Sequence, residues 1–246
     1  MEHSIEAIIF VAYSFLASIV TAGGGMLVTN ALHLTGVDLI KATGLTSSFF
    51  LVNAVIAVVA FRREIVWKEV KRILPVAVLG SFVGSTVLVN IMSPVVLLSL
   101  MFLFSLNFIY KKVKSVGSGA VASDSFVKDS LTGLFAGAVT GMALPGGGFL
   151  NSYFASKGLV LSQMFATLSI TIIFVYVVKV SVMLNSGILV PSDLTGVAIA
   201  FPFLIVSNIL VRKGLMKLSK AMTDKITIFS MVLFSIYALI TVLLEI

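Results

Sequence analysis

The chain has 246 residues, of which 59% are hydrophobic and only 11% are charged, and its mean hydropathy is +1.16. This composition excludes an ordinary soluble domain and predicts an integral membrane protein with several crossings. The absence of cysteine excludes disulfide frameworks, thiolate metal sites and cysteine nucleophiles. Because the surplus of basic residues accompanies apolar segments, we interpret it as an orientation signal, and we predict no binding to nucleic acid.

Six segments are long and apolar enough to cross a bilayer as helices, at roughly 20 residues per crossing. Five of them contain no charged residue: 42–61, 73–91, 95–110, 194–211 and 226–244. The sixth, 160–184, is longer and contains one charged residue, Lys179, so we expect it to tilt or to protrude. These segments predict an all-α, polytopic membrane protein.

Two further apolar segments are interrupted by glycine triplets. Residues 5–22 lead into Gly23, Gly24 and Gly25 and a short apolar arm at 26–34; residues 130–144 lead into Pro145, Gly146, Gly147 and Gly148 and a short arm at 149–156. A nine-residue helix rises only about 14 Å, roughly half of the hydrocarbon thickness, so neither short arm can cross. Each segment therefore predicts a re-entrant helical hairpin with its glycines deep in the membrane.

The basic residues indicate which loops face the cytoplasm. They concentrate in the loops 62–72, 111–128 and 212–225, with Lys157 at the mouth of the second hairpin, whereas the loops 92–94 and 185–193 contain none. The positive-inside rule then places 15 of the 17 basic residues inside, and Lys41 outside. In this orientation both termini lie outside the cell membrane.

A shift of about 123 residues aligns the second half of the sequence with the first. The first glycine triplet then falls on the second, and Ala42-Thr43 falls near Ala166-Thr167. Each half would hold one re-entrant hairpin and three transmembrane helices. The odd number of crossings gives the two copies opposite orientations. We therefore predict two inverted repeats, 1–112 and 129–246, joined by a cytoplasmic linker at 113–128, with their glycine tips meeting near the membrane midplane.

The two glycine tips are the predicted anion site. Glycine permits close backbone approach and positive φ, and the first amides of each short helix lack intrahelical partners and attract anions. Neutral hydroxyl and amide groups near the tips would complete a site for a small oxyanion. The candidate substrate-binding residues are Gly23, Gly24, Gly25, Thr46, Ser47, Asn53, Gly146, Gly147, Gly148, Asn151, Ser169, Thr171 and Lys179.

Each kind of candidate also has a purely structural interpretation, and the sequence leaves these open. The glycines could serve tight helix packing, and the Ser and Thr hydroxyls could bond to their own helix backbone. Lys179 could extend to the outer membrane surface instead of acting as an intramembrane charge that attracts or neutralises an anion.

The distribution of acidic residues and histidines excludes several other functions. All ten carboxylates lie in loops, at termini or near helix ends, which argues against an intramembrane proton relay and against an acidic cation pathway. Two histidines without cysteine cannot form a usual zinc or iron site. We therefore predict no enzymatic activity, no catalytic residue, no metal and no cofactor.

Several short motifs follow one another in an order that resembles the TauE/SafE sulfite exporter family, also called TSUP. After the first triplet come Leu34-Thr35-Gly36, the run from Ala42 to Ser47, the pair Val66-Trp67 in a basic loop, and the spacing of Gly80 and Gly84. The resemblance covers both halves. It implies a two-repeat helical membrane fold that moves sulfite, thiosulfate, sulfoacetate or related anions.

The leading interpretation is a secondary transporter, an exporter in the cell membrane, that binds a small sulfur oxyanion or organosulfonate between the tips and exposes it alternately to either face. Lys179 would be an outer electrostatic aid. The alternative is an anion channel in which the same opposed helices form a filter. Besides the substrate, membrane lipid is the one predicted partner; the anion, the direction, the coupling ion and the oligomeric state stay open.

Overall fold

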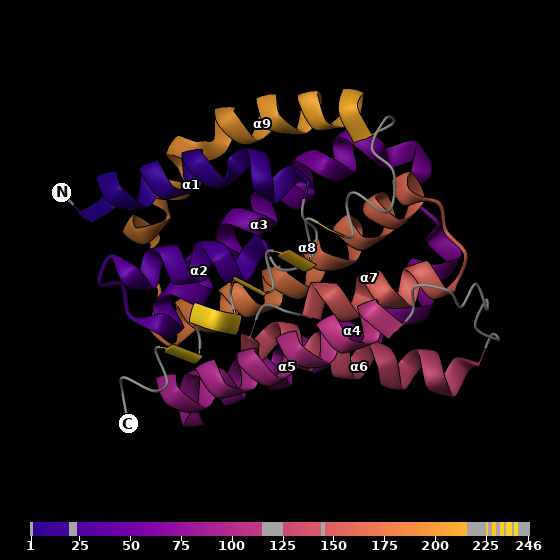
Figure 1. The fold of residues 1–246 in the computed structure, drawn as a ribbon, viewed down its shortest axis with the longest axis horizontal. Coiled ribbons are helices and arrows are strands. Elements are labelled where there is room, and N and C mark those ends of the chain that lie inside the picture. The colour runs from indigo at the N-terminus through magenta and orange to yellow at the C-terminus, as the bar shows by residue number, and fades with distance from the viewer. Residues whose placement is uncertain are drawn as a thin grey trace.

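The computed structural model describes residues 2–19, 24–114, 125–143 and 146–215, and short pieces between 225 and 240. Between residues 2 and 215 the described chain forms nine α-helices and two short 3-10 helices, the pieces between 225 and 240 are also helical, and no described residue is in a strand (Figure 1). The elements are α1 Glu2–Ile19, α2 Gly24–Leu34, α3 Leu39–Phe61, η1 Arg62–Glu64, α4 Trp67–Ile91, α5 Pro94–Lys114, α6 Phe126–Ala143, α7 Gly146–Ser156, α8 Leu161–Asn185, η2 Pro191–Leu194 and α9 Thr195–Leu215.

Four of the six predicted crossings are confirmed as helices long and apolar enough to span a membrane. They are Leu39–Glu64, Trp67–Ile91, Leu161–Asn185 and Pro191–Leu210. The predicted crossing at 95–110 is helical, as part of α5. The predicted crossing at 226–244 falls mostly outside the described residues. The all-α, multi-pass class is thus confirmed.

Helix α4 begins two turns earlier than predicted, so the loop expected at 62–72 is wrong over its second half. Residues Trp67 to Arg72 are helical, because Val70 and Ile73 point into the protein while Lys68 and Lys71 remain exposed on the other side. The prediction began the helix only after the last basic residue, Arg72. An amphipathic first part of a helix can include charged residues, because its charged side chains point to solvent while its apolar ones are buried.

The two short helices end in the same way. Gly36 follows α2 with φ +92°, and Gly158 follows α7 with φ +75°. The amide of Gly36 donates to the His33 carbonyl at 3.0 Å, and that of Gly158 donates to the Ala155 carbonyl at 3.1 Å. Glycine is favoured here because a side chain makes the left-handed conformation costly.

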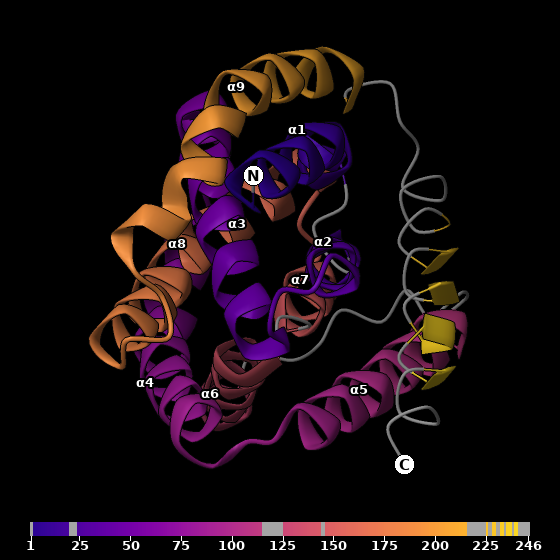
Figure 2. The ribbon, with the colours of Figure 1, turned by 90° about the vertical axis from the view of Figure 1, so that its left-hand side faces the viewer.

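Helices α3 and α8 pack against each other and run antiparallel. Gly44, near the start of α3, lies against Met183 near the end of α8, whereas Phe61 at the end of α3 packs edge-on against Phe165 near the start of α8, with ring centroids 5.3 Å apart. In the end-on view, α2 and α7 lie on one side of this pair, and α4 and α9 lie on the other (Figure 2). The pair therefore forms the centre of the bundle.

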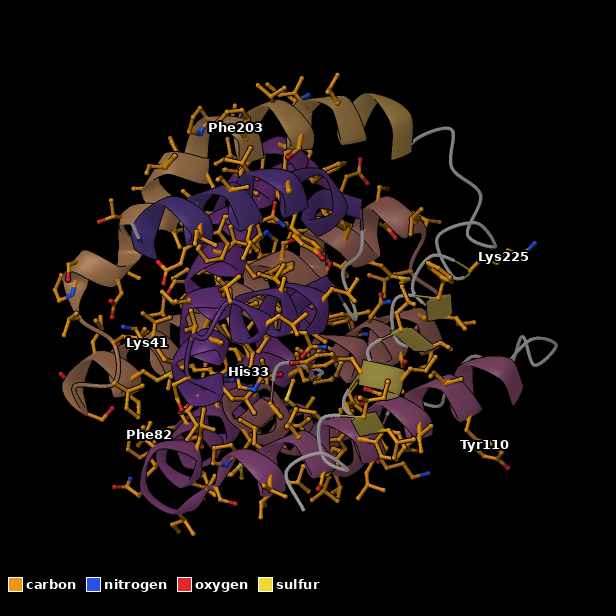
Figure 3. All side chains as sticks on the ribbon, turned by 60° about the vertical axis from the view of Figure 1, so that its left-hand side comes forward. His33, Lys41, Phe82, Tyr110, Phe203 and Lys225 are labelled. Carbon is orange, nitrogen blue, oxygen red and sulfur yellow. The ribbon has the colours of Figure 1, made fainter. Side chains whose placement is uncertain are left out.

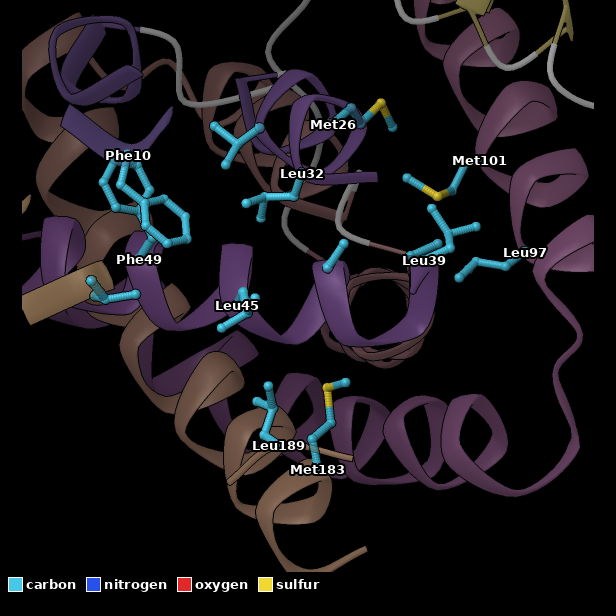
Figure 4. Close-up of a cluster of buried hydrophobic side chains, with 14 of the residues drawn as sticks. Phe10, Met26, Leu32, Leu39, Leu45, Phe49, Leu97, Met101, Met183 and Leu189 are labelled. Atoms are coloured by element: carbon cyan, nitrogen blue, oxygen red, sulfur yellow. The ribbon is translucent and has the colours of Figure 1, made fainter. Parts of the chain in front are cut away.

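The largest apolar cluster joins α1, α2, α3 and α5 to the end of α8 (Figure 4). Phe10 of α1 stacks on Phe49 of α3 with ring centroids 4.9 Å apart. Met26 and Leu32 bring α2 into the same cluster, and Leu97 brings in α5. The first short arm is thereby fixed against helices from its own half of the chain.

Helices α4 and α6 approach each other through glycines and run parallel. Gly133 faces Ile73, Gly137 faces Ala77, and Gly141 faces Ser81, so the separation in sequence stays constant along the interface. A Cβ on Gly137 would collide with the Ala77 carbonyl oxygen. Small residues in this spacing let two backbones touch where no water competes. The spacing of Gly80 and Gly84 therefore serves packing.

Large apolar side chains also cover the outside of the bundle. Phe82 of α4 and Phe203 of α9 are about half exposed, and both lie on the perimeter in Figure 3. In the same view Lys41 and His33 lie toward one end and Tyr110 toward the other. An apolar perimeter is expected for helices that face lipid.

Candidate functional site

The two short helices α2 and α7 point their glycine ends toward each other. In Figure 1 they lie end to end, and in the end-on view of Figure 2 they overlap. Helix α2 continues into α3 at the left of Figure 1, and α7 continues into α8 at the right, so the two N-termini face the middle of the bundle. Free amides and positive dipole ends from both helices thus point into one region.

The glycine triplets differ from the prediction in conformation. Gly24 and Gly25 belong to the first turn of α2, and Gly146 to Gly148 belong to the first turn of α7; Gly23 lies outside the described residues. The described glycines with positive φ are Gly36, Gly158 and Gly187, so the described triplet glycines do not adopt the positive φ that glycine permits. Their backbone is helical because the short arms begin within the triplets.

One neutral candidate is bound to the first tip. The hydroxyls of Thr29 in α2 and Thr46 in α3 share a hydrogen bond of 3.0 Å, and both side chains are fully buried. The Thr29 hydroxyl donates its proton to the Gly25 carbonyl at 3.0 Å. This chain of bonds connects the first turn of α2 to α3.

Other neutral candidates are engaged within the helix bundle. The hydroxyls of Ser47, Ser169 and Thr171 each donate to the carbonyl four residues earlier in their own helix. The Asn53 side-chain oxygen accepts a bond of 2.8 Å from Asn208 of α9. Asn151 lies half-buried in the second turn of α7. The three hydroxyls therefore bond to their own helix backbone, which is the structural alternative to a binding role. Asn53 connects α3 to α9.

Lys179 does not extend to a surface. Its side chain is fully buried, and its ammonium group donates to the Thr140 carbonyl of α6 at 3.4 Å, which is a long bond. Within the described part of the chain, no carboxylate lies within ion-pair distance of it. Thr140 is three residues from the end of α6, immediately before the second tip. The lysine therefore places a buried amino group, without an ion-pair partner among the described residues, close to that tip.

The sequence analysis missed a buried ionic cluster at the ends of α4, α6 and α7. Lys157 donates to Asp129 at 3.0 Å, Arg72 donates to the same carboxylate oxygen at 3.2 Å, and the Tyr153 hydroxyl donates to Glu69 at 3.0 Å. Both carboxylates are nearly buried. Their positions near helix ends were predicted. Their burial and mutual contact were not, because they lie in three separate segments of sequence.

Within the part of the chain that the structure describes, two buried polar side chains have no hydrogen-bond partner. They are Asn30 of α2, at both amide atoms, and Ser85 of α4, at its hydroxyl. Asn30 lies within two turns of the start of α2, yet the candidate residues chosen from the sequence do not include it. The missing partners depend on how helices are rotated against one another, which the sequence does not indicate. In the described ranges, no three His, Asp or Glu side chains gather closely enough to hold a metal ion.

Comparison with known proteins gives one match. The model of the family "Sulfite exporter TauE/SafE" matches residues 6–240, which is nearly the whole chain. No curated protein and no solved structure gives a match.

Proposed function

Because the chain belongs to the TauE/SafE sulfite exporter family, whose members are membrane transporters and not enzymes, we propose that it carries small sulfur oxyanions or organosulfonates across the cell membrane by alternating access. Family membership alone makes the chain a multi-pass membrane transporter of sulfur-containing anions in general. The proposal adds a binding site between the tips of α2 and α7, and two inverted halves that move around it.

Several features support the inverted repeats 1–112 and 129–246, with 113–128 as their linker. Helices α1 and α6 each have 18 residues, and α2 and α7 each have 11. Gly36 and Gly158 end the short arms alike. Between the halves, α4 packs on α6 as α9 packs on α1. The corresponding helices α3 and α8 run antiparallel, as copies related by an axis in the membrane plane would.

The burial of the Lys179 amino group, without an ion-pair partner among the described residues, is the observation that carries the choice of an anion. An unpaired ammonium group inside a membrane protein is costly, and a bound anion would offset that cost. The two facing helix N-termini favour the same sign of ligand. Gly147 and Gly148 are buried, so an anion at the second tip would be shielded from water.

The proposed site uses the candidates unequally. Backbone amides of the described triplet glycines would hold the anion, with Thr46 and Asn151 as the nearby neutral donors. Ser47, Asn53, Ser169 and Thr171 would need to exchange the bonds they make now, so we assign them to rearrangement between the two access states. Lys179 would neutralise the bound anion, and its burial beside α6 supports this role over that of an outer electrostatic aid.

Uptake of ³⁵S-sulfite and ³⁵S-thiosulfate into proteoliposomes tests the proposal. We expect saturable uptake that Lys179→Gln abolishes. Lys41→Gln is the matched control, because Lys41 is a partly exposed lysine with its own carboxylate, Asp193, at 2.9 Å. Unchanged uptake in a correctly folded Lys179→Gln variant would contradict the assigned role.

The same liposomes separate a transporter from the alternative, an anion channel. An alternating-access carrier returns faster when loaded, so unlabelled anion on the far side should accelerate uptake of labelled anion. A continuous pore shows no such stimulation and conducts as single channels in a planar bilayer. Single-channel currents carried by these anions would reject the carrier.

For orientation, we propose that the ionic cluster around Asp129 lies at the cytoplasmic end and that both termini lie outside. The cluster shares its end of α4 with the basic residues from Arg62 to Lys71, which the positive-inside rule assigns to the cytoplasm. Protease protection of terminal epitope tags in cells tests this orientation, and a cytoplasmic N-terminal tag would contradict it.

A further inference from the structure

Ser85 is an exception among the buried hydroxyl residues of this bundle. Ser14, Ser47, Ser48, Ser105 and Thr140 all donate to the carbonyl four residues earlier, which is the usual arrangement in apolar helices. The Ser85 hydroxyl is fully buried and bonds neither to its own helix nor to a neighbouring one. A buried hydroxyl without a partner costs free energy, so its position calls for a ligand.

The register of α4 against α8 brings Ser85 to the level of Lys179. The two helices run parallel, since Ser162 donates to Glu64 at the start of the interface and Ser81 donates to the Val175 carbonyl, at 2.8 Å, further along. One helical turn beyond Ser81 is Ser85, and one turn beyond Val175 is Lys179. The two helices therefore present a hydroxyl and an ammonium group at one level.

The last turn of α6 lies next to both Ser85 and Lys179. Gly141 lies against the Ser81 carbonyl and the Ser85 amide, and the adjacent Thr140 supplies the carbonyl that Lys179 contacts. The chain then enters the second tip after Ala143. Ser85, Lys179 and the N-terminus of α7 are thus grouped around the last turn of α6.

We infer that Ser85 is an anion-binding residue: its hydroxyl donates to one oxygen of the same sulfur oxyanion whose charge Lys179 neutralises. This inference rests on the proposed function and adds a residue and a ligand group to it. Sulfite, thiosulfate and sulfonates share an SO₃ group, whose several oxygens can accept from a hydroxyl, an ammonium group and helix amides at once. The two side chains do not bond to each other, so a shared oxyanion would satisfy both.

Binding of ³⁵S-sulfite and ³⁵S-thiosulfate to the purified full chain in nanodiscs tests this inference, together with the melting temperature of each variant. Ser85→Ala should weaken binding roughly tenfold to a hundredfold, the range of a hydrogen bond to a charged group, without lowering the melting temperature. Ser81→Ala is the matched control, because Ser81 lies one turn away on the same helix, is equally buried and already bonds to Val175. It should lower the melting temperature and keep the affinity.

The outcomes separate the inference from the proposed function. If the wild-type chain binds neither anion, both fail. If it binds and Lys179→Gln weakens binding while Ser85→Ala binds as the wild type does, the role of Ser85 is overturned and the proposed function stands. Misfolding of Ser85→Ala would also overturn the inference, because it would show that the hydroxyl is bonded within the protein. Ser85→Cys, with a weaker donor, should bind with intermediate affinity.

Discussion

Gly137→Ala places one methyl group where the structure has no room for it. The added Cβ would collide with the Ala77 carbonyl on α4, and both groups belong to helix backbones that cannot turn aside as a side chain can. Overpacking of this kind costs about 1–3 kcal/mol, and rigid neighbours favour the upper end. The better helix propensity of alanine offsets roughly 1 kcal/mol. The net expectation is a loss of about 2 kcal/mol of unfolding free energy.

Thermal unfolding in a single detergent measures this loss, with the fluorescence of Trp67 as the signal, because Trp67 begins α4 and is the one tryptophan of the chain. A chain of this size loses roughly 2–4 °C per kcal/mol, so the melting temperature should fall by about 4–8 °C. Gly196→Ala is the control at the α9–α1 interface. Its nearest neighbour would be the Glu6 Cβ at 3.3 Å, which a small shift can relieve, so it should lower the melting temperature far less than Gly137→Ala does. Equal melting temperatures for the two variants would refute the packing argument.

Three further variants test other contacts by the same melting assay. Lys157→Met leaves the buried Asp129 with Arg72 alone and should cost roughly 3 kcal/mol, most of it recovered by adding Asp129→Asn; a melting temperature equal to that of the wild type would show the pair to be solvated. Asn30→Leu removes two unpartnered polar atoms and should stabilise the anion-free protein by about 1–3 kcal/mol, and destabilisation would reveal a hidden partner. Gly36→Ala meets no neighbouring atom, so its expected loss of about 1–2 kcal/mol comes from backbone conformation, and no loss would contradict the positive φ.

The sequence predicted helix class and most helix positions because apolar runs of membrane length permit little else. It failed at boundaries where a helix continues through charged residues, as α4 does from Trp67 to Arg72. It also placed the triplet glycines between helices, whereas Gly24 and Gly146 already begin the short helices. Hydropathy locates the apolar interior of a helix, and capping and first-turn geometry decide its ends.

The sequence predicted candidate residues for the site, but it did not predict which of them contact one another. Facing glycine tips followed from the triplets and the charge distribution. Which side of α8 carries Lys179 did not, because the rotation of a helix that is apolar all round is set by its neighbours. The ionic cluster likewise depends on the register of α4 against α6, which brings Arg72 to Asp129 across 57 residues of sequence. That register is set by glycine contacts that only the packed structure shows.

The two tips are attached to different parts of the bundle, and this difference matters for the proposed mechanism. The first tip is held by the bond between Thr29 of α2 and Thr46 of α3, and by Met26, whose sulfur lies 3.3 Å from the Ser105 hydroxyl of α5. The second tip is held at the far end of its helix, where Lys157 and Tyr153 of α7 bond to α6 and α4. A displacement of the α4–α6 pair against α3 would therefore move one tip relative to the other. Because α6 also supplies the carbonyl of Thr140 that Lys179 of α8 contacts, such a displacement would also alter that contact beside the second tip.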